Sequence, residues 1–220
     1  MKRSSPRLCA AGVLAVFGVG CRSAPIPVQT GLQSRAGAQT AVKTQVPLGR
    51  YPYVTADVKF MTGMIPHHAQ AVVMAGWAPS HGASTGVRLL CERIVVGQTD
   101  EIRLMQTWLR ERHEAVPSAS STHMKMMMNG LEHDMLTPGM LSDEEMAQLD
   151  KSRGLAFDRL FLTGMIRHHR GAITMVDELF GSQGAGQDEV VFRFGSDVYA
   201  DQSTEIDRMQ KMLTPLQGKD

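Results

Sequence analysis

The chain contains an internal duplication, which constrains its fold more than any other feature of the sequence. Residues 57–75 (DVKFMTGMIPHHAQAVVMA) and 158–176 (DRLFLTGMIRHHRGAITMV) are identical at ten of nineteen positions, at an offset of 101. Further along each copy, residues 98–109 and 202–213 share a Gln-x-x-Glu-Ile-x-x-Met-Gln pattern at an offset of 104. Each copy is therefore expected to form one supersecondary unit, since repeats of this kind fold as repeated structural units.

Both parts of each repeat carry apolar residues at helical spacing. Residues at 3.6-residue intervals fall on one face of a helix and form the stripe that a bundle buries. Two such stripes occur in the first repeat: Phe60, Met64, Ala71 and Ala75, then Cys91, Ile94, Gln98, Ile102, Met105 and Leu109. Two helical hairpins in tandem bury four stripes most simply as a four-helix bundle, so the sequence predicts an all-α fold.

The domain boundaries follow from this arrangement. The two halves are expected at about residues 51–113 and 142–214, within a compact domain over residues 51–220. They are joined by a Met-rich segment at residues 114–141. Ser142 and Glu145 form a capping-box pattern, which predicts a short extra helix running to about Gly154.

The N-terminal region has the features of a targeting segment. Residues 1–20 combine a basic start with a short apolar run, which is typical of a secretory signal. Small residues precede Cys21, and this favours a lipoprotein-type signal with Cys21 lipidated over ordinary signal cleavage. Residues 21–50 lack periodicity and acidic residues, and are expected to form a flexible tether. The protein is therefore predicted to act outside the cytoplasm, in the periplasm or beyond the cell.

Charge and cysteine content exclude several classes of protein. Seven of the 23 basic residues and none of the 22 acidic ones lie in residues 1–50, so residues 51–220 carry a net charge of −6. Without clusters of Lys and Arg, this domain is not expected to bind nucleic acid. Three cysteines cannot form a disulfide scaffold, and Cys91 is expected to be a buried, inert thiol.

The histidines and methionines of the repeats are the candidate metal ligands. On a helix, the two adjacent histidines straddle the centre of the buried stripe, where the first methionine of the motif lies, and the second methionine falls near the first histidine. Both copies repeat this set: Met64, His67, His68, Met74, Met165, His168, His169 and Met175. Thioether and imidazole ligands suit Cu(I) and its mimic Ag(I), with Cu(II) as a further candidate. Zinc is the main competitor for the histidines alone, and plain core packing is the alternative to any metal.

Four polar residues on the second helix of each repeat are candidate supports for these ligands. Gln98, Glu101, Gln202 and Glu205 lie in or beside the apolar stripes. In that position they would accept the ring N–H of the histidines and fix the tautomer. Two alternatives stay open for the glutamates: direct coordination in a di-metal carboxylate site, or exposure to solvent.

The connecting segment holds a second candidate metal site. Met side chains cluster there beside two histidines: His123, Met124, Met126, Met127, Met128, His133 and Met135. The alternative is a hydrophobic lid packed on the bundle.

The two repeats resemble a known protein family. FMTGMIPHHAQAVVMA, FDRLFLTGMIRHHRGAITMV and the joining TPGMLSDEEMAQL resemble the domain of unknown function 305 family over roughly residues 55–214. The resemblance implies a ferritin-like four-helix architecture and a secreted or periplasmic location. It also implies copper binding, since one member is a periplasmic copper-binding protein linked to copper resistance. It points to the same eight Met and His residues of the repeats.

The sequence thus predicts an extracytoplasmic protein that binds Cu(I) for buffering, transfer or resistance. The expected partners are the metal ion and a copper-handling protein, with membrane contact through the lipid anchor only. We find no catalytic triad, phosphate-binding loop or paired catalytic carboxylates, so an enzyme is not the first hypothesis. The alternatives are a ferritin-like redox enzyme with a His/Glu metal site and a metal-free helical interaction module.

Overall fold

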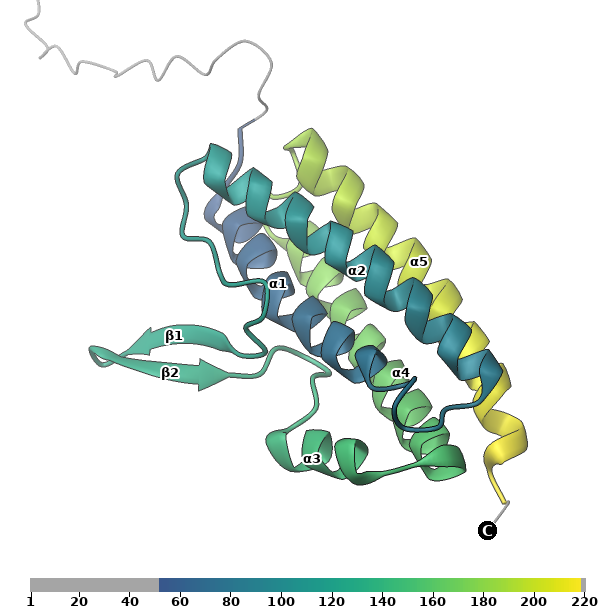
Figure 1. Ribbon diagram of the computed structural model, residues 1–220. Coiled ribbons are helices and arrows are strands. Elements are labelled where there is room, and N and C mark those ends of the chain that lie inside the picture. Colours follow the sequence, from purple (N-terminus) through teal and green to yellow (C-terminus); the bar gives the residue numbers. More distant parts are fainter. Residues whose placement is uncertain (1–51, 219–220) are drawn as a thin grey trace, which may run out of the picture. The chain divides into compact units, whose positions relative to one another are not determined.

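The structure is a computed structural model that describes residues 52–218. These residues form five α-helices, two strands and one short 3₁₀ helix (Figure 1). Their bounds are α1 Thr55–Gly76, α2 Thr85–Glu111, β1 Met124–Met128, β2 Leu131–Met135, α3 Asp143–Lys151, α4 Gly154–Gly181, α5 Glu189–Leu213 and η1 Thr214–Leu216. The predicted signal peptide, Cys21 and the tether lie outside the described residues. Within the described part, no helix is long and apolar enough to cross a membrane.

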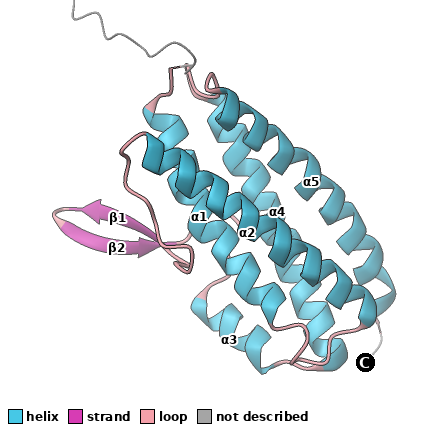
Figure 2. Cartoon of the chain, turned by 45° about the horizontal axis from the view of Figure 1, so that its top comes forward, coloured by secondary structure: helices cyan, strands magenta, loops and turns pink. Residues whose placement is uncertain are grey.

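The four long helices form two hairpins that pack together (Figures 1 and 2). α1 pairs with α2 and α4 pairs with α5, while α1 and α4 contact each other between the hairpins. α1 and α4 run antiparallel, because Gly63 of α1 faces Met175 of α4 and Gly164 of α4 faces Met74 of α1. The prediction of a mainly helical chain is confirmed; the ferritin-like classification stays a prediction.

The predicted apolar stripes form the core. All ten residues of the two stripes named for the first repeat are buried, including the polar Gln98. Cys91 is a buried free cysteine, and burial raises the pKa of its thiol to about 12. The thiol therefore stays protonated at neutral pH, as an inert core residue does.

The duplicated aspartates tie the two repeats together. Asp57 of α1 accepts a hydrogen bond from the backbone N–H of Gly186 at 2.7 Å, in the loop between α4 and α5. Asp158 of α4 accepts from the backbone N–H of Ser84 at 3.2 Å, in the loop between α1 and α2. Each repeat thus holds the interhelical loop of the other.

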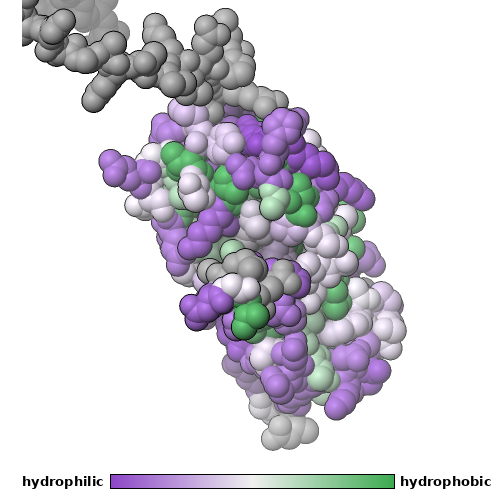
Figure 3. All heavy atoms as spheres, turned by 90° about the vertical axis from the view of Figure 1, so that its left-hand side faces the viewer, coloured by the Kyte–Doolittle hydropathy of each residue, from purple (hydrophilic) through white to green (hydrophobic). Residues whose placement is uncertain are grey.

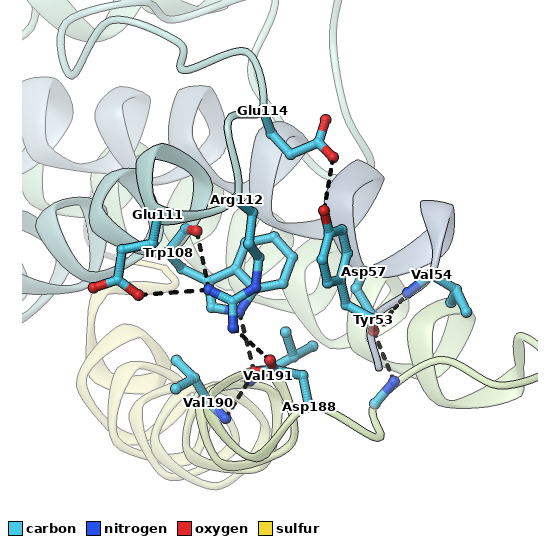
Figure 4. A network of polar contacts seen from close by, with 11 residues as sticks. Tyr53, Val54, Asp57, Trp108, Glu111, Arg112, Glu114, Asp188, Val190 and Val191 are labelled. Atoms are coloured by element: carbon cyan, nitrogen blue, oxygen red, sulfur yellow. Dashed lines mark hydrogen bonds and ion pairs between the residues drawn. The ribbon is translucent and has the colours of Figure 1, made fainter. Parts of the chain in front are cut away.

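A polar network fastens one end of the bundle (Figure 4). Asp188 caps the start of α5, accepts from the indole N–H of Trp108 at 3.0 Å and pairs with Arg112. The guanidinium of Arg112 also lies 4.2 Å from the centre of a Trp108 ring. Burial alone would raise the pKa of Asp188, but the hydrogen bonds from Trp108 and Arg112 bring it below its ordinary value. The network joins the C-terminal end of α2 to the N-terminal end of α5.

The connecting segment differs from the all-α prediction because it contains a β-hairpin. β1 and β2 pair antiparallel from Met124 opposite Met135 to Met128 opposite Leu131. The turn residues Asn129 and Gly130 have φ of 53° and 78°. These positive angles are those of the two-residue turns that match the twist of a hairpin. The predicted short helix after the hairpin is present as α3, with the Ser142–Glu145 capping box, and ends at Lys151.

Candidate metal centre

The histidine pairs of the two repeats meet where α1 packs against α4. The ring centres of His67 and His168 are 3.8 Å apart, with their planes tilted by 40°. The other two, His68 and His169 (called the outer histidines), each lie about 6 Å from their neighbour in sequence (6.2 Å and 6.3 Å between ring centres). All four histidines are fully buried. The two motifs therefore share one centre, a point that the sequence left open.

Three ring nitrogens of the central pair have no hydrogen-bond partner among the described residues. These are Nδ1 of His67 and both nitrogens of His168. The fourth, Nε2 of His67, lies 3.1 Å from the carbonyl oxygen of Pro138. Buried polar atoms nearly always have a partner, and an exception calls for an explanation such as an absent ion.

The central histidines are neutral at physiological pH. Burial, followed by repulsion from His68, lowers the pKa of His67 from 6.5 to about 3. Burial and the neighbouring histidines also lower the pKa of His168 well below 6.5. A neutral imidazole keeps a lone pair on one nitrogen, which is the form that binds metals.

The outer histidines contact glutamates of the neighbouring helices. Nε2 of His68 lies 2.8 Å from a carboxylate oxygen of Glu101, and Nε2 of His169 lies 2.6 Å from one of Glu205. The glutamate side chains are about a quarter exposed, at 25% and 26%. The structure thus brings together the predicted His–Glu pairs; that they support metal ligands stays a prediction.

The glutamines behave differently from the glutamates. Gln98 and Gln202 are buried as predicted, but their Oε1 atoms have no hydrogen-bond partner among the described residues. They therefore do not accept the ring N–H of a histidine in this structure.

The four motif methionines are buried and form a pair toward each end of the bundle. Met64 and Met175 belong to the core near the start of α1, whereas Met74 and Met165 belong to the core near its end. Because α1 and α4 are antiparallel, the histidine contact lies between these two thioether pairs.

Part of the connecting segment closes over the centre. The side-chain amide of Gln70 donates to the carbonyl of Leu141 at 2.9 Å and accepts from its N–H at 2.8 Å. Gly171 lies under Pro138 so closely that an added Cβ would stand 1.8 Å from the Pro138 carbonyl oxygen. Sequence reasoning missed this closure. The available signal was that Gln70 and Gly171 occupy equivalent positions of the repeats and yet differ.

The second predicted metal site is described only in part, and it stays a prediction. His123 pairs with Asp143 of α3 at 3.3 Å, and His133 is exposed on β2. Met124 and Met135 lie opposite each other at the base of the hairpin; nothing is described for the side chains of residues 126–128. Among the described residues, the four histidines of the centre included, His, Cys, Asp and Glu side chains alone form no group of three or more arranged to hold a metal.

Fold and site together define a duplicated helical-bundle protein with a buried centre of four histidines. The chain belongs to the family described as "Domain of unknown function (DUF305)", whose sequence signature matches residues 57–213.

Solved structures of the family share the fold. A DUF305 protein of Streptomyces coelicolor, a presumed secreted protein, is 26% identical and superposes with a TM-score of 0.61 over 75% of this chain and 96% of that chain. CopM is 25% identical in its Cu(II)-bound form, with a TM-score of 0.54 over 72% of this chain and 96% of that one. Its Ag-bound form is also 25% identical, with a TM-score of 0.54 over 74% and 98%.

One curated protein matches in part. Uncharacterized protein L153 of Acanthamoeba polyphaga mimivirus is 34% identical over 56 residues, which are 26% of this chain. The match spans 37% of that protein, little more than a third of its length.

Proposed function

We propose that this protein binds Cu(I) at the contact between His67 and His168, for copper buffering, transfer or resistance outside the cytoplasm. The motif methionines Met64, Met74, Met165 and Met175 supply thioether ligands on either side. Glu101 and Glu205 orient the outer histidines, His68 and His169.

One observation carries this proposal: three ring nitrogens of the central pair are buried without a partner among the described residues. The residues around them fit Cu(I). Imidazoles with lowered pKa values are neutral, thioethers need no deprotonation, and such ligands suit a soft monovalent ion. To bind the ion, His67 would exchange its hydrogen bond to the Pro138 carbonyl.

The relatives support the choice of metal. CopM, of the same fold, is solved with Cu(II) and with Ag bound. Ag(I) resembles Cu(I) in its preference for soft ligands, so the likeness favours copper or silver over zinc here.

Location and partners are part of the same proposal. Residues 1–20 act as a secretory signal, Cys21 carries the lipid, and residues 21–50 tether the domain to the membrane. The presumed secretion of the Streptomyces coelicolor relative is in keeping with this. The partner is a copper-handling protein that delivers or accepts the ion.

An anaerobic Cu(I) titration against a competing chelator tests the site. Replacing His67, His68, His168 and His169 with Ala should weaken binding by more than about a hundredfold, because losing even a hydrogen-bond partner of a ligand costs about 10–100-fold. The matched control, His113→Ala, removes a histidine outside the centre and should bind as the wild type does. Wild-type affinity in a folded quadruple variant would refute the proposal.

Two other functions make different predictions. A redox enzyme with a His/Glu site should retain iron or manganese and consume oxygen, yet each described glutamate of the centre contacts only one histidine. A metal-free interaction module should show no rise in Tm on adding Cu(I) or Ag(I). A metal ion raises the Tm of a protein only if it binds the native state.

A further inference from the structure

A groove of about 760 Å³ opens beside the histidine centre, between the base of the hairpin and helices α1 and α4. Figure 3 views the molecule from the side on which the hairpin projects, where apolar and polar side chains alternate over the surface. Met124 and Met135 line the groove from the hairpin, Met175 from α4, and Pro138 from the connecting segment. The lining is mainly apolar, and its sulfur atoms are its distinguishing chemistry.

Three thioethers converge on this groove. A Cβ placed on Gly63 of α1 would stand 3.7 Å from Sδ of Met124 and 3.4 Å from Cε of Met175. Met135 is the cross-strand partner of Met124, so its side chain emerges on the same face of the hairpin. Because Gly63 has no side chain, both Met124 and Met175 can lie close to it.

The duplication supplies an internal comparison. Gly164 is the equivalent of Gly63 in the second repeat, and a Cβ there would stand 3.5 Å from Cε of Met74. The place of Met124 is taken at Gly164 by Leu141, whose δ carbons lie 3.2 Å and 3.4 Å from that Cβ position. Leu141 and α3 leave a hollow of only about 150 Å³ on that side. Around Gly164, a leucine thus fills the space between the helices and the connecting segment. Around Gly63, where methionines take its place, the groove stays open.

The charges of the groove also select the class of ligand. Its charged lining residues are one lysine, Lys59, and one glutamate, Glu178, both exposed. Divalent cations that prefer oxygen ligands would find a single carboxylate there. Neutral thioethers suit a soft monovalent cation.

We propose that Met124, Met135 and Met175 form a second metal site, which captures Cu(I) or Ag(I) at the surface. The site adjoins the histidine centre and shares Met175 with it, while Met124 and Met135 belong to the groove alone. Pro138, which lines the groove, accepts the hydrogen bond from His67, and Met175 shares its core cluster with Met64. That the captured ion passes on to the histidines rests on the proposed function, whereas binding in the groove does not.

NMR of the protein labelled with ¹³C at the methionine ε-methyl groups tests capture directly, with Ag(I) as the probe. The ε-methyl signals of Met124, Met135 and Met175 should shift together on addition of Ag(I), while those of Met105 and Met209, in the core, stay in place. Groove signals that do not move while Ag(I) binds elsewhere would overturn the proposal. This measurement needs no substitution, so it does not depend on a variant that folds.

The double variant Met124→Leu/Met135→Leu tests the path. It removes two thioethers from the hairpin and leaves the bundle intact, and Met105→Leu/Met209→Leu is its matched control. Loading of the histidine centre, followed through the histidine ring signals, should slow by at least about tenfold in the hairpin variant only. Unchanged loading would show that the groove is not the entry.

The two proposals fail in different ways. In His67→Ala/His168→Ala, the groove signals should still respond to Ag(I) if the groove binds by itself. If the histidine signals of the wild type never respond, the proposed function fails while the groove site stands.

Discussion

His67 and His168 occupy equivalent positions in the two repeats, but the connecting segment gives them different surroundings. His67 has one nitrogen against the Pro138 carbonyl, and His168 has no hydrogen-bond partner among the described residues. A buried imidazole without a partner is costly to keep. In the proposed site, this asymmetry would make His168 the more readily available ligand, with His67 held in place opposite it.

The protonation of these two residues yields a prediction for the metal-free protein. The pKa of His67 is about 3 in the folded chain, against 6.5 for an unperturbed histidine such as that of the unfolded chain. The unfolded state therefore binds more protons between these values, so stability should fall as pH drops from 6.5 toward 3. Each such histidine contributes about 1.4 kcal/mol per pH unit within the window. Stability is fully restored above pH 6.5.

Urea denaturation between pH 4 and pH 7 measures this effect. His168→Ala should show a shallower dependence on pH than the wild type, and His113→Ala the same dependence. Equal slopes for wild type and His168→Ala would mean that the centre is already hydrated and protonated when folded.

At the scale of elements, the helices and the hairpin differ in how far the sequence predicted them. The helical stripes are long and periodic, so residues such as Ile94, Ile102 and Leu109 identified the core face. The hairpin was missed although Asn129-Gly130 is a strong turn signal, because the run of methionines gave no alternation of apolar and polar residues. The meeting of His67 with His168 depends on how the repeats pack, which periodicity within one helix cannot define.

The contact between α4 and the connecting segment yields a second prediction. Gly171→Ala places a methyl group against the Pro138 carbonyl, and the backbone of Pro138 and Gly139 leaves it no room. The substitution should destabilise the protein by about 1–3 kcal/mol, as overpacking does. It should also release His67 from Pro138, and the ring signals of His67 should report this by NMR.

Gly97→Ala is the matched control, since an added Cβ on this residue of α2 meets nothing within 4 Å. It should stabilise the protein by about 0.5–1 kcal/mol, the ordinary gain from replacing a helical glycine. If Gly171→Ala behaves as Gly97→Ala does in urea denaturation, the segment does not press on α4 in solution.

At the scale of the whole molecule, the duplication has produced interdependent halves. Asp57 of the first repeat holds the loop of the second at Gly186, and Asp158 of the second holds the loop of the first at Ser84. The histidine centre likewise draws two residues from each half. Because His67 and His168 come from different repeats, neither repeat can form the centre alone.

This exchange predicts that the halves unfold as one unit. Asp158→Ala removes the buried carboxylate that accepts from the backbone N–H of Ser84, which should cost about 1–3 kcal/mol, as loss of a hydrogen bond to a charged group does. Although Asp158 lies in α4, hydrogen exchange should then quicken in the first repeat as well, around Ser84 and the start of α2. Asp207→Ala removes an exposed carboxylate on α5 and should leave both stability and exchange unchanged. Faster exchange confined to α4 and α5 would show instead that the two hairpins are stable independently and that the centre forms only when they dock.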